Sequence, residues 1–455
     1  MDLFESRAVE KGLLQAVYLL ETLRRLLVDG NTRMDMHGLC VCKTYLTVGL
    51  IERFGHAFGV AVKLLHSSTC QDRELVLRSL EEIFEILCFQ KAFESPVVLC
   101  AAYIALLKNR PSLQETTKGT KRVRVDSCFG GMVSTLNSVG YDFVLQEMLA
   151  TGLEDVEALA ALGIALDNCP DGANLPLATL MIVEDISFTI AKLLFGLTRN
   201  ILTTSSSEVF VAQLKLILKI LQEKVTLLQF NSDSQPKAVS KWNLDHLIAN
   251  LTVACSPACP HLQGSATPDD IFDSIGSVTL SLLQLYHRRL SSKYHLLVRL
   301  LQTILHLFIL TTPLAPRPLR TTLSRPPPWL ISPCTVPSAK LFSRILTMWA
   351  DPPSTLWRSE SKRQKMTSNV AKTGKAVSKH VPWFMMEYVA LLAEYPELVI
   401  EQGVQKALAE GVYALFGVLG TYEREMCMAA LDGSGRGIFK NLWEEWNKFG
   451  RFVEQ

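Results

Sequence analysis

The sequence predicts an all-α protein, arranged as an irregular α-solenoid or helical-repeat-like array that ends in a compact helical unit. Apolar residues recur at every third or fourth position through most of the chain, which places them on one face of a helix. Strict alternation of apolar and polar residues, typical of half-buried strands, is nearly absent. Because no repeat of fixed length is present, we expect helices that pack in pairs without the regular period of an armadillo or HEAT array.

Helical spacing is clear near the N-terminus and continues along the chain. In the first segment Leu13, Val17 and Leu20 recur at helical intervals while charged residues occupy the other faces. The segment 76–87 repeats this arrangement. The same pattern predicts helices over about residues 141–166, 177–200, 208–229, 271–288, 293–310, 383–395, 403–419 and 436–449.

Changes in composition divide the chain into three parts. A helical body is predicted over residues 1–310, interrupted by a basic, glycine-containing loop at about 109–131. Residues 311–337 hold eight of the twenty prolines, which break helix interiors and therefore predict an extended connector. Residues 338–455 are expected to form a helical C-terminal unit that contains a mobile basic segment at about 351–379.

The composition excludes several broad classes of protein. With 48% hydrophobic and 20% charged residues, the chain can bury substantial cores and is not disordered as a whole. A formal net charge of +2 provides no global attraction to nucleic acid or membranes. No run reaches the roughly 18 apolar residues of a membrane span. Eleven scattered cysteines, mostly in apolar helical stretches, favour an intracellular, reducing compartment.

One cluster of cysteine and histidine resembles the start of a metal site. Cys255, Cys259 and His261 offer three ligand types that zinc accepts. A structural zinc site normally has four ligands, and no second pair lies nearby in the sequence. A proline-containing turn accounts equally well for these residues, so the sequence predicts no metal ligand.

No pattern of residues indicates catalysis or a bound cofactor. The glycine-rich stretch that begins at Asp432 lacks the preceding strand and the Gly-Lys-Ser/Thr ending of a phosphate-binding loop. It predicts a turn between helices, with Asp432 or Ser434 near the N-cap. His287, His295 and His306 fall on adjacent predicted helices, where single histidines are more often packing residues than catalytic ones. We therefore predict a protein that is not an enzyme and that binds no cofactor.

Two groups of cations are the candidates for contact with RNA or a partner protein. Seven Lys or Arg against one Glu lie between Arg358 and Lys379, so this stretch can follow phosphates without reading bases. The alternatives are a solvated linker or a nuclear localisation patch. Arg436 and Lys440 lie on one helix face, suited to a partner carboxylate or an RNA phosphate. The candidate contact residues are Lys362, Arg363, Lys365, Lys372, Lys375, Lys379, Arg436 and Lys440.

The C-terminal part of the chain contains a succession of short motifs. They are KHVPWFMMEY at 379–388, AEGVYALF at 409–416, MAALDGSGRGIFK at 428–440 and WNKFGR at 446–451. In this order they resemble the C-terminal domain of nucleolar pre-rRNA-processing proteins of the Urb/Npa type, the "unhealthy ribosome biogenesis" family. The resemblance covers about residues 270–455. Chains of this family are usually much longer.

Within these motifs two features concern packing. Gly411 is expected to allow a close approach between chain segments, because glycine carries no Cβ. Phe439, Trp443 and Trp446 follow one helical stripe and are expected to pack in the core.

The resemblance implies a non-enzymatic scaffold of nucleolar pre-60S ribosome assembly that supports processing of large-subunit pre-rRNA. It also implies partners among pre-ribosomal particle proteins, including a second Urb/Npa-type scaffold and an RNA helicase, with non-specific contact to pre-rRNA. No membrane, cofactor or small-molecule substrate is implied. The alternative functions are a generic HEAT-like adaptor in another nuclear or trafficking complex and a helical enzyme with an unrecognised pocket.

Overall fold

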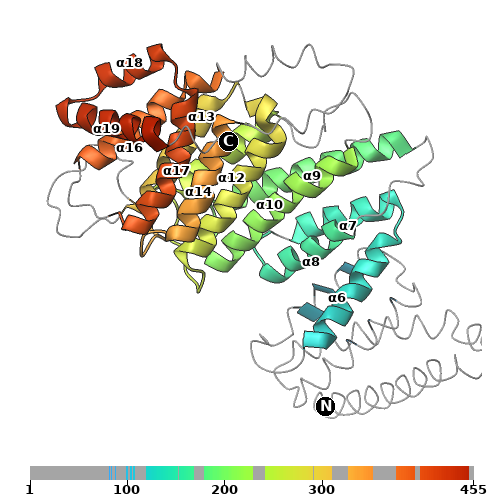
Figure 1. Ribbon diagram of the computed structural model, residues 1–455. Helices are drawn as coiled ribbons and strands as arrows, with labels where there is room; N and C mark the ends of the chain where they lie inside the picture. Colours follow the sequence, from blue (N-terminus) through green and yellow to red (C-terminus); the bar gives the residue numbers. More distant parts are fainter. Residues whose placement is uncertain are drawn as a thin grey trace, which may run out of the picture. The chain divides into compact units, whose positions relative to one another are not determined.

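The computed structural model describes isolated positions between residues 81 and 107 and then most of the chain from 119 to 449. The described ranges are 119–151, 153–168, 179–228, 241–290, 292–309, 326–351, 376–394 and 400–449. These ranges hold thirteen α-helices and one short 3-10 helix, and their only β-type pairing is an isolated bridge between Ser206 and Gln263 (Figure 1). The all-α prediction is confirmed, whereas the solenoid arrangement stays a prediction.

The chain divides into two compact units, residues 1–189 and 190–455. The first unit contains α6 (Gly119–Ser134), α7 (Ser138–Thr151) and α8 (Val156–Asp167), and helix α9 (Thr179–Asn200) crosses the boundary. The second unit contains α10 (Ser207–Leu228), α11 (Lys241–Ala254), α12 (Pro268–Leu290), α13 (Tyr294–Leu305), the 3-10 helix η2 (His306–Phe308), α14 (Val336–Ala350), α16 (Val381–Glu394), α17 (Gln402–Val418), α18 (Thr421–Ala430) and α19 (Gly433–Phe449).

Two buried tyrosines of the first unit pack their rings in its core and donate hydrogen bonds through their hydroxyl groups. The ring of Tyr103 stacks on Phe129 with centroids 4.1 Å apart, and its hydroxyl donates to Asp126 Oδ1 at 2.5 Å. Tyr141 is buried on α7 and donates to the carbonyl of Ala165 on α8 at 3.2 Å. A buried tyrosine is stabilising in this way because its polar end has found a partner.

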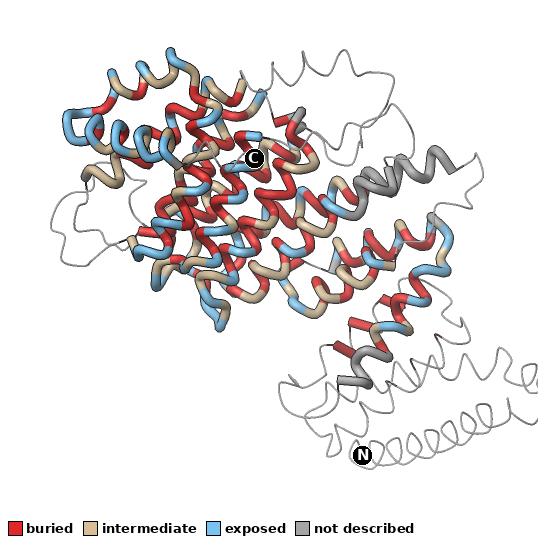
Figure 2. The backbone as a smooth tube through the Cα atoms, in the orientation of Figure 1, coloured by how far each residue is buried: buried red, intermediate tan, exposed pale blue. Residues whose placement is uncertain are grey.

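The core of the second unit lies between four helices that pack in sequence. Helices α10, α12, α14 and α17 lie side by side in that order (Figure 1). A chain of ring contacts joins α12, η2, α14 and α16, with centroid distances of 5.3, 5.7 and 6.2 Å. The rings belong to Phe272, Phe308, Phe342 and Phe384. Many turns of these helices are buried, whereas α18 and α19 present many exposed turns (Figure 2).

The proline-rich connector does not separate two units as the sequence led us to expect. Helix α12 precedes the connector and packs against α14, which follows it, so both belong to the second unit. Trp329 is buried, and its Nε1 donates to the carbonyl of Ala254 at 2.9 Å. Residues 336–337 form the first turn of α14, where proline is tolerated because that turn needs no N–H donor. Residues 310–325 lie outside the described part.

The expected basic loop at 109–131 is wrong over its second half. Residues 119–131 belong to α6, and residues 109–118 lie outside the described residues. Val125, Phe129 and Val133 are all buried, and their spacing of four residues drives the helix despite the glycines and cations nearby.

The last residues of the expected mobile basic segment adopt a helical turn. Residues 376–378 form a helical turn ahead of α16, and Val377 is fully buried. Residues 352–375, which carry most of the positive charge of the segment, lie outside the described residues. The predicted mobility of residues 351–379 stays a prediction.

Candidate interaction surface

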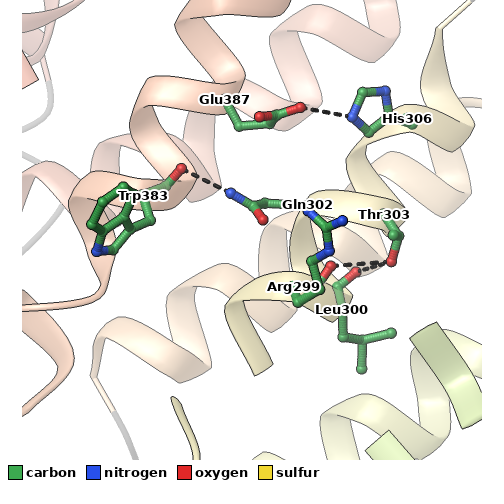
Figure 3. Close-up of polar contacts among 7 residues, drawn as sticks. All are labelled: Arg299, Leu300, Gln302, Thr303, His306, Trp383 and Glu387. Atoms are coloured by element: carbon green, nitrogen blue, oxygen red, sulfur yellow. Dashed lines mark hydrogen bonds and ion pairs between the residues drawn. The ribbon is translucent and has the colours of Figure 1, made fainter. Parts of the chain in front are cut away.

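Polar contacts fasten α16, which begins with the first family-like motif, to α13 and η2. His306 Nε2 lies 2.9 Å from Glu387 Oε1, and Gln302 Nε2 donates to the carbonyl of Trp383 at 3.0 Å (Figure 3). His306 is buried, whereas Glu387 is 28% exposed. These contacts fix how α16 sits on the core, and therefore which of its residues face outward.

The three histidines noted in the sequence do not form one site. His287 is buried on α12 and its Nε2 lies 2.8 Å from the hydroxyl of Tyr294. His306 contacts Glu387, and His295 is exposed. Each histidine therefore has different neighbours, and the three do not combine into one site.

We expect the stability of the second unit to decrease in acid because of His287. Burial lowers the pKa of this imidazole from 6.5 to about 4, so the folded protein favours the neutral ring. The stabilisation from this group is complete above pH 6.5 and is lost as the pH falls through 4. Between about pH 7 and about pH 4.5 the loss should amount to about 2.5 kcal/mol, measured by urea unfolding at the two pH values.

The matched control for this prediction is His287→Gln, whose amide carbonyl accepts from Tyr294 at any pH. The variant should lose less free energy of unfolding between the two pH values than the wild type. Equal losses in the wild type and His287→Gln would show that His287 does not titrate in this range.

Cys255 and Cys259, together with Cys334 of the proline-rich segment, pack as buried thiols. Cys255, Cys259 and Cys334 are all buried, and burial raises the pKa of Cys259 to about 12. Burial and the two neighbouring thiols likewise raise the pKa of Cys255. His261 is exposed, with its Nδ1 3.3 Å from the carbonyl of Leu262. The described residues contain no group of three or more His, Cys, Asp or Glu side chains placed to hold a metal ion.

The two predicted contact residues of α19 are exposed in the first turns of the helix, just after the turn that joins α18 to α19. Asp432 is the N-cap, because its Oδ1 accepts from the backbone N–H of Gly435 at 2.7 Å. Arg436 is exposed, and its Nε donates to the carbonyl of Leu431 at 2.9 Å. Lys440 is exposed one helical turn further on. Their placement suits an anionic partner, but their role in contact stays a prediction.

The remaining candidate contact residues fall in or beside the basic segment. Lys379 is exposed in the turn that precedes α16. The other five lie outside the described residues, namely Lys362, Arg363, Lys365, Lys372 and Lys375. The structure therefore brings none of these five to a defined place.

Helix α19 is anchored by an aromatic cluster centred on Phe416 of α17. The centroid of Phe416 lies 5.6 Å from Phe439, 5.5 Å from Trp443 and 6.2 Å from Trp446. Phe439 is buried and the two tryptophans are half-buried. Arg424 of α18 places its guanidinium 4.4 Å from the centre of the Trp443 ring, a cation–π contact. The expected packing role of Phe439, Trp443 and Trp446 is confirmed.

Two exposed aromatic side chains on this part of the fold were missed by sequence reasoning. Trp383 of α16 is 56% exposed and Tyr422 of α18 is 74% exposed. The segment 381–394 is apolar on nearly all sides, so its hydrophobic pattern does not reveal which residues face outward. Large exposed aromatic residues are common in binding surfaces because they provide contact area at a low cost in conformational entropy.

Taken as a class, this is an all-helical protein whose C-terminal helices carry exposed cationic and aromatic side chains. Residues 215–455 match the family model described as the Urb2/Npa2 family. Because the match covers just over half of the 455 residues, the chain belongs to the Urb2/Npa2 family of ribosome-biogenesis factors. The family is not known for enzymatic activity. No curated protein and no solved structure matches the chain.

In the described part of the chain, every helix is too short or too polar to span a membrane. Ribosome biogenesis, which the family membership indicates, is a nuclear and nucleolar process.

Proposed function

We propose that the chain is a non-enzymatic scaffold in nucleolar pre-60S assembly that supports processing of large-subunit pre-rRNA. The family membership of residues 215–455 carries this proposal. The structure adds support because the matched region contains an exposed cationic pair, Arg436 and Lys440, on a helix that is anchored firmly by its buried face.

The proposed partners are other proteins of the pre-ribosomal particle, among them a second Urb/Npa-type scaffold and an RNA helicase. The exposed side chains that suit a protein partner are Trp383 of α16, Tyr422 of α18, and Arg436 and Lys440 of α19. Aromatic residues and arginine are enriched in protein interfaces relative to the rest of a surface, and the cations suit a partner with complementary negative charge.

The experiment that tests the proposed function is affinity purification of the tagged chain, followed by sedimentation. We expect the chain to sediment with pre-60S particles and to recover large-subunit pre-rRNA together with assembly factors. An adaptor of another nuclear or trafficking complex would sediment apart from these particles. Recovery of such a complex without pre-rRNA would contradict the proposal.

The basic segment is expected to contribute to RNA binding through its charge. Changing Lys362, Arg363, Lys365, Lys372 and Lys375 to glutamine removes the cations that can neutralise phosphates. If about four of them contact phosphates, log Kd should depend on log salt less steeply by about three to four in the variant. Fluorescence anisotropy with unrelated RNA sequences at several salt concentrations measures this slope.

The control for the basic segment is folding of the helical units, which the five changes should leave intact by circular dichroism. Nuclear import is followed separately, with a fluorescent fusion, because the same lysines also suit an import signal. A salt slope equal to that of the wild type would leave the segment as a linker.

A further inference from the structure

An exposed aromatic surface lies on α9 and α11, away from the motifs discussed so far. Phe195 of α9 is 47% exposed and stacks on the imidazole of His246, with centroids 5.1 Å apart and planes inclined by 18°. Trp242 lies one helical turn before His246 on α11 and is 80% exposed. A tryptophan with so much of its surface in water buries little apolar area and therefore contributes little to the stability of the fold.

Two contacts fix the direction of α9 relative to α11. Phe195 stacks on His246, and three residues later the carbonyl of Thr198 accepts from Asn250 Nδ2 at 2.7 Å. Residue numbers rise together in both helices, so the helices run in the same direction along this surface. The N-terminal end of this surface therefore contains Trp242 on α11 and, on α9, the residue one turn before Phe195.

Cations flank the aromatic rings on α9. Lys192 is exposed one turn before Phe195, and Arg199 is exposed one turn after it. Among the described side chains of these two helices the one acidic group is Asp245, whose carboxylate already pairs with Lys293 Nζ at 2.5 Å. The described part of the surface is therefore positive and has aromatic rings between its charges.

We propose that this aromatic and cationic surface binds single-stranded RNA, with bases stacked on Trp242 and on the Phe195–His246 pair. Bases stack on exposed aromatic faces whatever their identity, and cations beside the rings follow the phosphates that connect successive bases. Among the described side chains of this surface, the one carboxylate is already paired with Lys293, which favours a polyanion as the ligand. The inference rests on the proposed function for the source of the RNA, the pre-rRNA of the particle.

The test uses the purified full chain and short, fluorescently labelled oligouridylate and oligoadenylate. Trp242→Ala should raise Kd roughly tenfold or more for both sequences, because one stacked base is lost. Trp242→Phe retains an aromatic face and should recover part of this loss. Arg199→Gln should reduce the slope of log Kd against log salt by about one, whereas Trp242→Ala should leave that slope unchanged.

Two comparisons sharpen the test. The same Trp242→Ala change is repeated in the chain whose basic segment carries the five glutamines, so that binding through that segment does not hide the effect. Phe143→Ala is the matched control, because Phe143 is a 52% exposed aromatic residue in the first compact unit, and its removal should leave Kd unchanged.

The outcomes separate this inference from the proposed function. A chain that sediments with pre-60S particles but binds neither oligonucleotide overturns the RNA-binding surface and leaves the scaffold proposal standing. Binding that depends on Trp242 in a chain that does not sediment with the particles overturns the scaffold proposal alone. A Kd for Trp242→Ala within about twofold of the wild type overturns the inference.

Discussion

Replacement of Gly411 by alanine is expected to lower the free energy of unfolding of the second unit by about 2 kcal/mol. A Cβ at this position would lie 2.7 Å from Ser343 Cα and 2.8 Å from the Ser343 carbonyl oxygen, both of which are backbone atoms of α14. Because backbone cannot rotate away, α14 and α17 must move apart. The gain of about 1 kcal/mol in helix propensity offsets only part of this cost.

Gly437→Ala is the matched control for Gly411→Ala. Gly437 also lies inside a helix, but a Cβ there would meet no atom within 4 Å, so this variant should gain up to about 1 kcal/mol of stability. Urea or thermal unfolding of both variants measures the difference. If the two alanines had the same effect, the close approach of α14 and α17 at Gly411 would not limit side-chain size.

Helices with a clear polar face were predicted well from the sequence. The expected segments 208–229 and 403–419 correspond to α10 and α17, each within one residue at both ends. Both helices have apolar residues at helical spacing and charged residues opposite, so local periodicity and burial agree. The expected segment 141–166 is two helices, because Asp155 caps α8 with an oxygen that accepts from the Glu157 N–H at 3.2 Å.

Helices whose sequence contradicts their environment were missed. Helix α11 combines an exposed Trp242 with a buried Asn250 that donates to the carbonyl of Thr198, which reverses the usual placement of apolar and amide side chains. In α6, glycines and cations lie among the buried residues, so the apolar pattern is hard to recognise in the sequence. In both helices, long-range contacts override the local pattern from which a sequence prediction is made.

The candidate surface was predictable only in part. The spacing of Arg436 and Lys440 and the cap at Asp432 follow from local helix geometry, which a sequence contains. The exposure of Trp383 depends on how the α13 and η2 side chains hold α16, over a sequence separation of 81 residues. The α9–α11 surface likewise requires knowing which helices are neighbours. Tertiary contacts of this kind cannot be inferred from periodicity.

Replacement of Phe416 by alanine should have the largest effect of the variants considered, a loss of about 3–5 kcal/mol in the free energy of unfolding. Phe416 is 1% exposed, and its ring is the common contact of Phe439, Trp443 and Trp446. Its removal leaves a cavity beneath α19, which the rings of α19 can fill only if the helix shifts on α17. The tryptophan fluorescence of the folded protein should therefore change, and the midpoint of unfolding should decrease.

Tyr422→Ala is the control for Phe416→Ala, because Tyr422 is a 74% exposed aromatic residue on the neighbouring α18 and its loss should change stability by at most about 0.5 kcal/mol. Because Tyr422 is also among the side chains proposed to contact a partner, Tyr422→Ala is a control for stability alone. Phe416→Ala should weaken sedimentation with pre-60S particles by displacing Arg436 and Lys440, and Phe416→Leu, which refills most of the cavity, should restore it. If Phe416→Ala left both the unfolding free energy and the tryptophan fluorescence as in the wild type, the aromatic cluster would not anchor α19.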